Sequence, residues 1–417
     1  MGMLGLYYTG IRKRMFPFLA WAALGWLAHA QTTEDEMLDQ LLFGDDLPSL
    51  DLESVTPETP RAPATEEPAP GTGDYHTGLP RWDKDFSIRM DVGYADNPLL
   101  SPYEKDGSGF LRSSFDAFLY RPPSDAGFQT YLYTFGEFNA YEDVEGMDAS
   151  SLFMLQNELG WTDTDGIETG FQLKYTFYDQ VYDASFNEFE QASATVQANQ
   201  FEIRPFLRSP MGENSFLGAE LAAVHVLYGN PGEDYYEGHF RSFLGQRYGH
   251  GSKVELDLTA TWREYDEREQ RDGSGSSMDG TLKRRSLGSS LEWTHYFDSN
   301  QVWSARTSGS LQGVMDNGGG YYDYNLIRGR ISVTRRGTKW NATAKLGLSS
   351  YDYKKQLGDD DRTKLFRTSF SSAVLLGRSF GENWAGFLEW QREEDFSNQR
   401  GYEYNANVVS IGGARSL

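Results

Sequence analysis

The sequence has 417 residues, a formal net charge of -23 and no cysteine. The lack of cysteine excludes a disulfide scaffold, thiol catalysis and a lipid-modified N-terminal cysteine. The acidic balance argues against nucleic acid as a partner, because phosphate binding needs a basic surface. Aromatic residues make up 15% of the chain and glycine contributes 44 residues, a mixture that favours strands and turns over helices.

The N-terminus has the pattern of a secretory signal. The basic residues 11–14 precede an apolar run at residues 16–27, and Ala28-His29-Ala30 matches a small-x-small cleavage site. The apolar run is shorter than the ~20 residues that a spanning helix needs. Residues 1–30 are therefore predicted to be a signal peptide, with Gln31 as the mature start.

Residues 31–80 are acidic and then rich in Pro, Glu and Thr. Such a segment buries too little apolar surface to offset its chain entropy, so it is predicted to be a disordered periplasmic linker. Its apolar residues at 37–43 are open to two interpretations, a nascent helix in a tail or a docking peptide for a periplasmic partner.

From residue 81 to residue 417, apolar and polar residues alternate. In residues 253–265 the apolar side chains Val254, Leu256, Leu258, Ala260 and Trp262 would share one face of an extended strand. Roughly 16 such segments, of about ten residues or more, recur along the chain, which is longer than the usual soluble strand and is the length that a tilted strand needs to cross a bilayer.

The connections between these segments alternate in length. Short ones rich in Gly, Pro, Asn and Asp are expected at residues 121–125, 163–166, 209–212, 248–251, 297–300, 335–337 and 380–383. Longer polar ones are expected at residues 141–150, 179–191, 228–238, 265–284, 315–324, 351–364 and 393–404. This alternation predicts a transmembrane, antiparallel up-and-down β-barrel of about 16 strands, with short periplasmic turns and long outer loops.

Aromatic residues near the predicted strand ends fit an interfacial girdle, although aromatics are also good strand formers in general. They are Tyr94, Tyr175, Phe177, Tyr178, Tyr265, Tyr296, Phe297, Trp340, Tyr351, Tyr353, Phe380 and Trp384.

On these features the chain resembles bacterial outer-membrane β-barrels, and more narrowly porin-like barrels that follow a signal peptide and an acidic linker. Gly93-Tyr94-Ala95-Asp96-Asn97-Pro98 looks like the Gly-Tyr-x-Asp-Asn turn near the start of such barrels. The resemblance implies insertion by the barrel-assembly machinery, which commonly reads a terminal Phe. Here the last residue is Leu417, and Arg415 interrupts the terminal apolar face.

The sequence contains few candidate catalytic or metal-binding residues. The histidines His225, His239, His250 and His295 show no metal-ligand spacing, and no phosphate loop, HExxH or GxSxG motif occurs. The acidic run 359–361 lacks the alternation and glycine of an EF-hand. We expect no enzyme activity, no cofactor and no metal site.

The polar strand faces carry charges of both signs, which in a barrel of this width would line the lumen and bias its selectivity. The predicted pore-lining residues are Arg89, Asp91, Lys174, Glu255, Asp257, Arg263, Glu292, Arg328, Arg330, Lys345 and Glu389.

The sequence therefore predicts an outer-membrane, porin-like channel for passive passage of small polar solutes in the Gram-negative envelope. Outer-membrane lipid and lipopolysaccharide are its expected surroundings, and the oligomeric state is left open. The alternative from a different class is a secretion or assembly barrel for an exported polysaccharide or surface protein, with residues 31–80 as a periplasmic contact.

Overall fold

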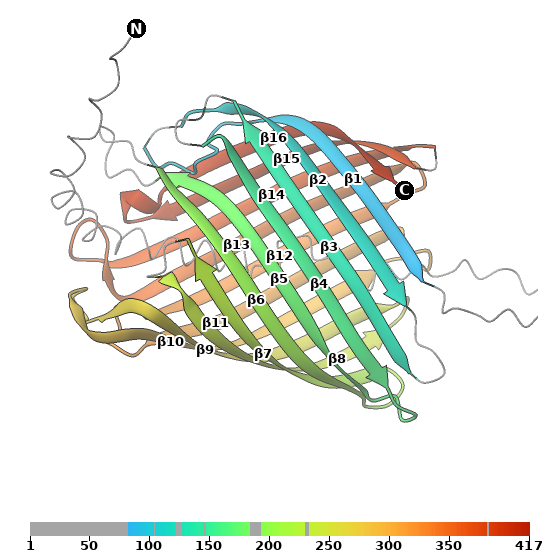
Figure 1. The fold of residues 1–417 in the computed structure, drawn as a ribbon, viewed down its shortest axis with the longest axis horizontal. Helices are drawn as coiled ribbons and strands as arrows, with labels where there is room; N and C mark the ends of the chain where they lie inside the picture. Colours follow the sequence, from blue (N-terminus) through green and yellow to red (C-terminus); the bar gives the residue numbers. More distant parts are fainter. Residues whose placement is uncertain are drawn as a thin grey trace, which may run out of the picture. The chain divides into compact units, whose positions relative to one another are not determined.

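The computed structural model describes residues 82–103, 105–121, 127–142, 144, 147–183, 193–229, 233–381 and 383–417. The predicted signal peptide and linker lie outside these residues. The described residues form a closed barrel of 16 antiparallel strands, in which each strand pairs with its neighbours in sequence and β1 pairs with β16 (Figure 1). The predicted all-β, up-and-down barrel is confirmed.

The strands are β1 (Asp83–Ala95), β2 (Ser108–Arg121), β3 (Phe128–Tyr141), β4 (Ala149–Thr162), β5 (Glu168–Asp183), β6 (Ser193–Pro210), β7 (Ser215–Tyr228), β8 (Tyr235–Tyr248), β9 (Ser252–Arg271), β10 (Ser277–Tyr296), β11 (Trp303–Asp316), β12 (Tyr324–Arg336), β13 (Trp340–Leu357), β14 (Lys364–Phe380), β15 (Trp384–Ser397) and β16 (Tyr404–Ser416). A 3-10 turn, η2 (Arg400–Tyr402), precedes β16. Among the described residues, no helix is long and apolar enough to cross a membrane.

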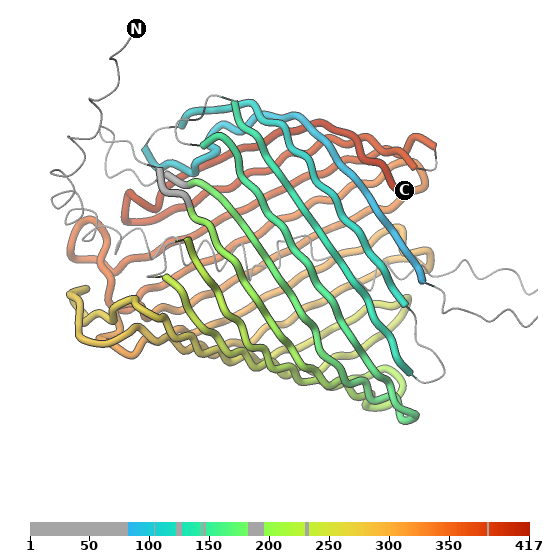
Figure 2. Tube along the Cα trace, viewed as in Figure 1, coloured from blue at the N-terminus to red at the C-terminus, as the bar shows by residue number. Residues whose placement is uncertain are grey.

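Tight turns join the strands at one end of the barrel, as the sequence predicts. Gly166, Gly212, Gly249 and Gly381 lie in these turns with positive φ, a conformation that glycine adopts without steric cost. We call this end the short-turn end and the opposite one the loop end. The strands run obliquely between the two, and the chain's last strand returns beside its first (Figure 2).

The predicted long connections are partly wrong, because several strands continue past the point where the apolar alternation stops. The clearest case is the predicted loop at residues 265–284. It is mostly strand, since β9 and β10 have 20 residues each and only residues 272–276 connect them. Backbone pairing persists there between side chains that are mostly polar on both faces, with a register shift around Thr281. We call residues 266–282 the β9–β10 ribbon.

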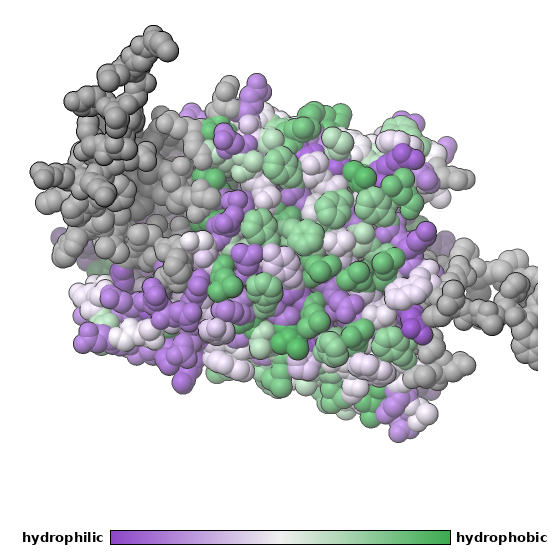
Figure 3. Space-filling model, in the orientation of Figure 1, coloured by the Kyte–Doolittle hydropathy of each residue, from purple (hydrophilic) through white to green (hydrophobic). Residues whose placement is uncertain are grey.

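The outer surface of the barrel is apolar. Leu256 and Leu258 on β9 are 47% and 55% exposed, whereas Glu255 and Asp257 between them are 8% and 5% exposed. Exposed apolar side chains recur around the barrel, as at Ile411, which is 61% exposed. Figure 3 shows apolar residues spread over one face of the barrel, with polar residues gathered towards the loop end. A closed sheet with an apolar exterior satisfies every backbone group inside a bilayer, so this is the exterior of a membrane-spanning barrel.

Candidate functional site on the interior wall of the barrel

The interior face of the barrel carries every charged residue that the sequence predicts to line a pore. Cross-strand register sets them opposite other inward-facing residues, as in the pairs Asp91–Arg112 and Lys174–Glu202. The alternate residues of the same strands belong to the exposed apolar exterior. On this wall the charges fall into two different arrangements.

The first arrangement crosses the seam where the barrel closes. Arg112 on β2 contacts Asp91 at 2.7 Å and Glu389 at 2.6 Å, and Arg89 contacts the same Glu389 at 2.5 Å. Gly412 on the intervening strand β16 permits this approach, because a Cβ there would lie 2.4 Å from the Cβ of Asp91. Arg89, Asp91 and Glu389 are thus brought together.

A chain of ion pairs continues across the interior face of β4–β9, which we call the paired wall. At its centre, Arg241 on β8 contacts Glu220 at 3.2 Å, Glu255 at 2.5 Å and Asp257 at 2.5 Å. Ser290 on β10 donates a hydrogen bond to the second oxygen of Asp257 at 3.0 Å. One guanidinium therefore serves three carboxylates that are themselves nearly buried.

The paired wall extends on both sides of Arg241. Arg208 on β6 contacts Glu168 at 3.4 Å and Glu158 at 3.8 Å. Towards the loop end, the Nε of Arg263 contacts Glu237 at 2.8 Å. Most charges on this wall therefore have a protein group of opposite sign as their partner.

Sequence reasoning missed several members of the paired wall, namely Glu158, Arg204, Arg208, Glu220 and Arg241. The strands β6 to β8 have apolar residues on both faces, such as the inward Phe206, Val224 and Phe243, so their alternation is weak. The regular alternation of β9 did place Glu255 and Asp257 next to each other on the inward face. Two neighbouring inward carboxylates require a cation from an adjacent strand, so they indicated that one lies on β8 or β10.

The second arrangement lies on β11, β12 and β13. Their inward-facing positions between residues 304–314, 326–336 and 341–351 hold cations and no carboxylate. The cations are Arg306, Arg328, Arg330, Arg336 and Lys345. We call this surface the cation wall.

Two of the cations on the cation wall lie beside serine hydroxyl groups. Arg328 lies opposite Ser310 and donates a hydrogen bond to the Oγ of Ser349 at 3.3 Å. Lys345 lies opposite Ser332 and is exposed. At the edge of this wall, Arg306 contacts Glu292 on β10 at 2.8 Å. Guanidinium groups among hydroxyls offer hydrogen-bond donors to an anion.

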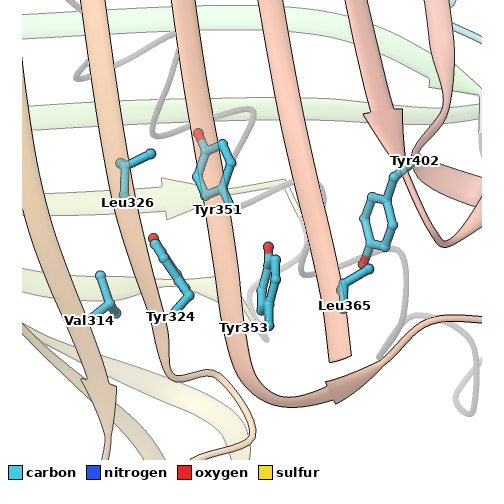
Figure 4. Packing of buried hydrophobic residues seen from close by; sticks show 7 residues of the cluster. All are labelled: Val314, Tyr324, Leu326, Tyr351, Tyr353, Leu365 and Tyr402. Carbon is cyan, nitrogen blue, oxygen red and sulfur yellow. The ribbon is translucent and has the colours of Figure 1, made fainter. Parts of the chain in front are cut away.

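Above the cation wall, at the loop end, a buried cluster of apolar and tyrosine side chains covers the inner surface of β11–β14 (Figure 4). Its members are Val314, Tyr324, Leu326, Tyr351, Tyr353, Leu365 and Tyr402. Beside it, Arg367 forms an ion pair with Asp395, and both side chains are buried.

The aromatic girdle predicted from the sequence is therefore only partly present. Trp340, Phe380 and Trp384 are exposed on the exterior, but Tyr265, Tyr351 and Tyr353 are buried on the interior. Position near a strand end does not determine the face, which depends on the register of each strand.

The histidines His225 and His295 lie on the exterior. Their rings stack on Tyr236 at 4.0 Å and on Trp293 at 5.3 Å, as the interpretation of strand or interfacial residues expects. Across the residues that the structure describes, no group of three or more His, Asp or Glu side chains is arranged to hold a metal ion.

No family model matches the sequence, and no curated protein matches it. Solved structures with similarity include an anion-selective porin from Comamonas acidovorans, at 10% identity and a TM-score of 0.41, covering 81% of this chain and 99% of that one. A BenF-like porin from Pseudomonas fluorescens Pf-5 has 9% identity, a TM-score of 0.41 and the same coverage, 81% and 99%. A bacterial polysaccharide outer-membrane secretin has 9% identity and a TM-score of 0.38, covering 80% and 97%.

Proposed function

We propose that this protein is an outer-membrane channel for passive passage of small polar solutes, with a preference for anions. The cation wall is the observation that carries the proposal. Five inward-facing cations on β11–β13 have no carboxylate among the inward-facing residues of the same stretches. At Arg328 and Lys345, which lie opposite serines, an anionic solute would supply the negative charge that the protein itself supplies on the paired wall.

The exterior supports the location. A closed antiparallel barrel with exposed Leu, Ile, Val and Trp side chains is stable in a bilayer, and barrels of this type belong to outer membranes. A barrel of 16 strands has the width for an aqueous channel. The predicted signal peptide would provide export.

The spacing of the cations suits the transfer of an anion from one cation to the next, and does not favour tight binding of the anion at one position. Arg328 and Arg330 alternate with exterior residues on β12, so they are roughly 7 Å apart along the strand. A small anion can pass from one guanidinium to the next without losing all of its contacts. Conduction needs sites that attract the solute and release it. The mechanism is size exclusion combined with this charge bias, and it requires no cofactor.

Planar-bilayer recording tests the proposal. In a salt gradient, the reversal potential of the wild type should report anion preference. The triple variant Arg328→Gln, Arg330→Gln, Lys345→Gln should reduce the anion-to-cation permeability ratio several-fold, because lumen charges set selectivity. As a matched control, Lys283→Gln, Arg285→Gln, Arg392→Gln removes the same charge from the exterior and should leave the ratio unchanged. Steady conductance with a cation preference in the wild type would contradict the anion bias.

The second candidate is an export barrel for an acidic polymer. It is favoured by one observation, the continuous inward row on β12 from Tyr324 and Leu326 to Arg328, Arg330 and Arg336, which would contact an extended chain along its length. Deleting residues 31–80 separates the two candidates. A passive channel should keep its conductance without them, whereas an export barrel that needs a periplasmic contact should lose polymer secretion in cells.

A further inference from the structure

A Trp–Arg pair occurs three times on the exterior at the short-turn end. Trp303 lies opposite Arg335 on β11 and β12, Trp340 opposite Arg378 on β13 and β14, and Trp384 opposite Arg415 on β15 and β16. The guanidinium carbons are 5.9, 5.0 and 5.2 Å from the ring centroids. The pairs therefore form one strip over six consecutive strands, which we call the Trp–Arg strip.

The side chains of the strip are accessible. Trp303, Trp340 and Trp384 are 46%, 52% and 55% exposed. Arg378 and Arg415 are exposed and Arg335 is half-buried. Within the described residues, none of these three arginines has a carboxylate within ion-pair distance, and Arg335 donates one hydrogen bond to the backbone oxygen of Trp340 at 3.1 Å. Their charges are not neutralised by the described parts of the protein.

Two exterior cations at the loop end are arranged differently. Lys283 contacts Glu264 at 2.6 Å, and Arg392 contacts Glu394 at 2.7 Å. There the protein supplies the counter-charge. At the short-turn end it supplies an aromatic face, which orients the guanidinium and leaves N–H groups available to a further acceptor.

We propose that the Trp–Arg strip binds the phosphate groups of anionic phospholipids in the leaflet at the short-turn end. Trp side chains prefer the depth of lipid headgroups, where the apolar ring meets water. A guanidinium held at that depth is matched to phosphate, which accepts two parallel hydrogen bonds from it. Arginines on alternate strands are roughly 10 Å apart, so adjacent pairs can contact adjacent headgroups.

This site is independent of solute passage, because it lies on the exterior and requires only that the barrel spans a bilayer. It also gives Arg415 a role. The residue that interrupts the apolar face of the last strand is the third cation of the strip.

Lipid retention by the full-length mature protein tests the proposal. The protein is placed in nanodiscs of phosphatidylcholine and phosphatidylglycerol, extracted into mild detergent, and its retained lipids are quantified by mass spectrometry. The wild type should be enriched in phosphatidylglycerol. The triple variant Arg335→Gln, Arg378→Gln, Arg415→Gln should lose at least tenfold in apparent affinity, since each cation near a charged surface contributes roughly fivefold.

The matched control Lys283→Gln, Arg285→Gln, Arg392→Gln removes three exterior cations from the loop end and should keep the enrichment. The variant Arg335→Lys, Arg378→Lys, Arg415→Lys should retain an intermediate part of it, because an ammonium keeps the charge but not the paired donors. Heat-modifiable gel mobility verifies that each variant is folded.

Three results would overturn the proposal. The first is equal phosphatidylglycerol retention by the wild type and the glutamine variant. The second is an equal loss in the loop-end control. The third is displacement of phosphatidylglycerol from the wild type by lipopolysaccharide or by inorganic phosphate at equal phosphate concentration, which would assign the strip to that source instead.

Discussion

The paired wall and the cation wall face the same lumen but treat charge in opposite ways. On the paired wall, Arg241 has three carboxylate partners on neighbouring strands. On the cation wall, Arg328 contacts a serine hydroxyl and Lys345 is exposed beside Ser332. The first set of charges holds strands together, whereas Arg328 and Lys345 in the second lie opposite serines and not carboxylates. Net charge alone, at -23 for the whole chain, would suggest a preference for cations, which is opposite to the anion preference that we propose.

The largest effect should follow from removing the centre of the paired wall. Arg241→Met removes the cation that Glu220, Glu255 and Asp257 share, and should cost about 3–5 kcal/mol of unfolding free energy. The matched substitution Arg328→Met on the cation wall removes one hydrogen bond and should cost about 1 kcal/mol. Urea unfolding of the barrel in lipid vesicles measures both. Equal costs would show that the two walls do not differ in this way.

The second largest effect should follow from placing a charge on the lipid-facing exterior, where it has neither a protein partner nor water. Leu258→Lys places an ammonium on the apolar exterior of β9 and should cost about 2–4 kcal/mol near the bilayer midplane. The control Asp266→Lys lies on the β9–β10 ribbon, beyond the apolar alternation, and should change stability by about 0.5 kcal/mol or less. The same unfolding assay applies, and a neutral Leu258→Lys would place this face outside the lipid.

Charge reversal on the cation wall should change function more than stability. Lys345→Glu should shift the permeability ratio towards cations several-fold while changing unfolding free energy by about 1 kcal/mol or less. Asp257→Lys on the paired wall should lose stability as well, because it sets a second cation beside Arg241. Reversal potentials and urea unfolding on both variants separate the walls, and a stability loss as large in Lys345→Glu would contradict the difference.

The smallest effect concerns a carboxylate whose partners are backbone groups outside the membrane. Hydrogen bonds from the N–H groups of Trp303 and Val302 lower the pKa of Asp298 in the turn after β10. A depressed pKa in the folded state means that the carboxylate stabilises the turn above its unfolded pKa, near 3.8, and loses that contribution as the pH falls through the folded value. The protection factor of the Val302 amide against hydrogen exchange should therefore fall only in strong acid. A protection factor that already falls near neutral pH would exclude Asp298 as the cause.

The barrel was predictable because period-two alternation and glycine-rich turns are local signals. The same alternation on β1, β9, β12 and β13 gave the inward faces of Arg89, Asp257, Arg328 and Lys345. The alternation does not indicate which residue on an adjacent strand lies beside a given side chain. Arg89 and Glu389 meet although 300 residues separate them, because the barrel closes between β1 and β16.

The strand ends were harder to predict for a different reason. In the β9–β10 ribbon the side chains on both faces are mostly polar, so the alternation stops although the backbone pairing continues. The alternation of apolar and polar residues reflects the environment of the side chains. The backbone hydrogen bonds of a strand do not require an apolar environment, so the strand can extend beyond the alternation.

That ribbon offers a direct way to determine which side of the membrane each end of the barrel faces. The sequence contains no cysteine, so any introduced thiol is unique. Ser274 lies at the ribbon's tip and Ser299 in a turn at the opposite end, and both are exposed. A membrane-impermeant maleimide added to intact cells should label Ser274→Cys and leave Ser299→Cys unlabelled until the envelope is opened.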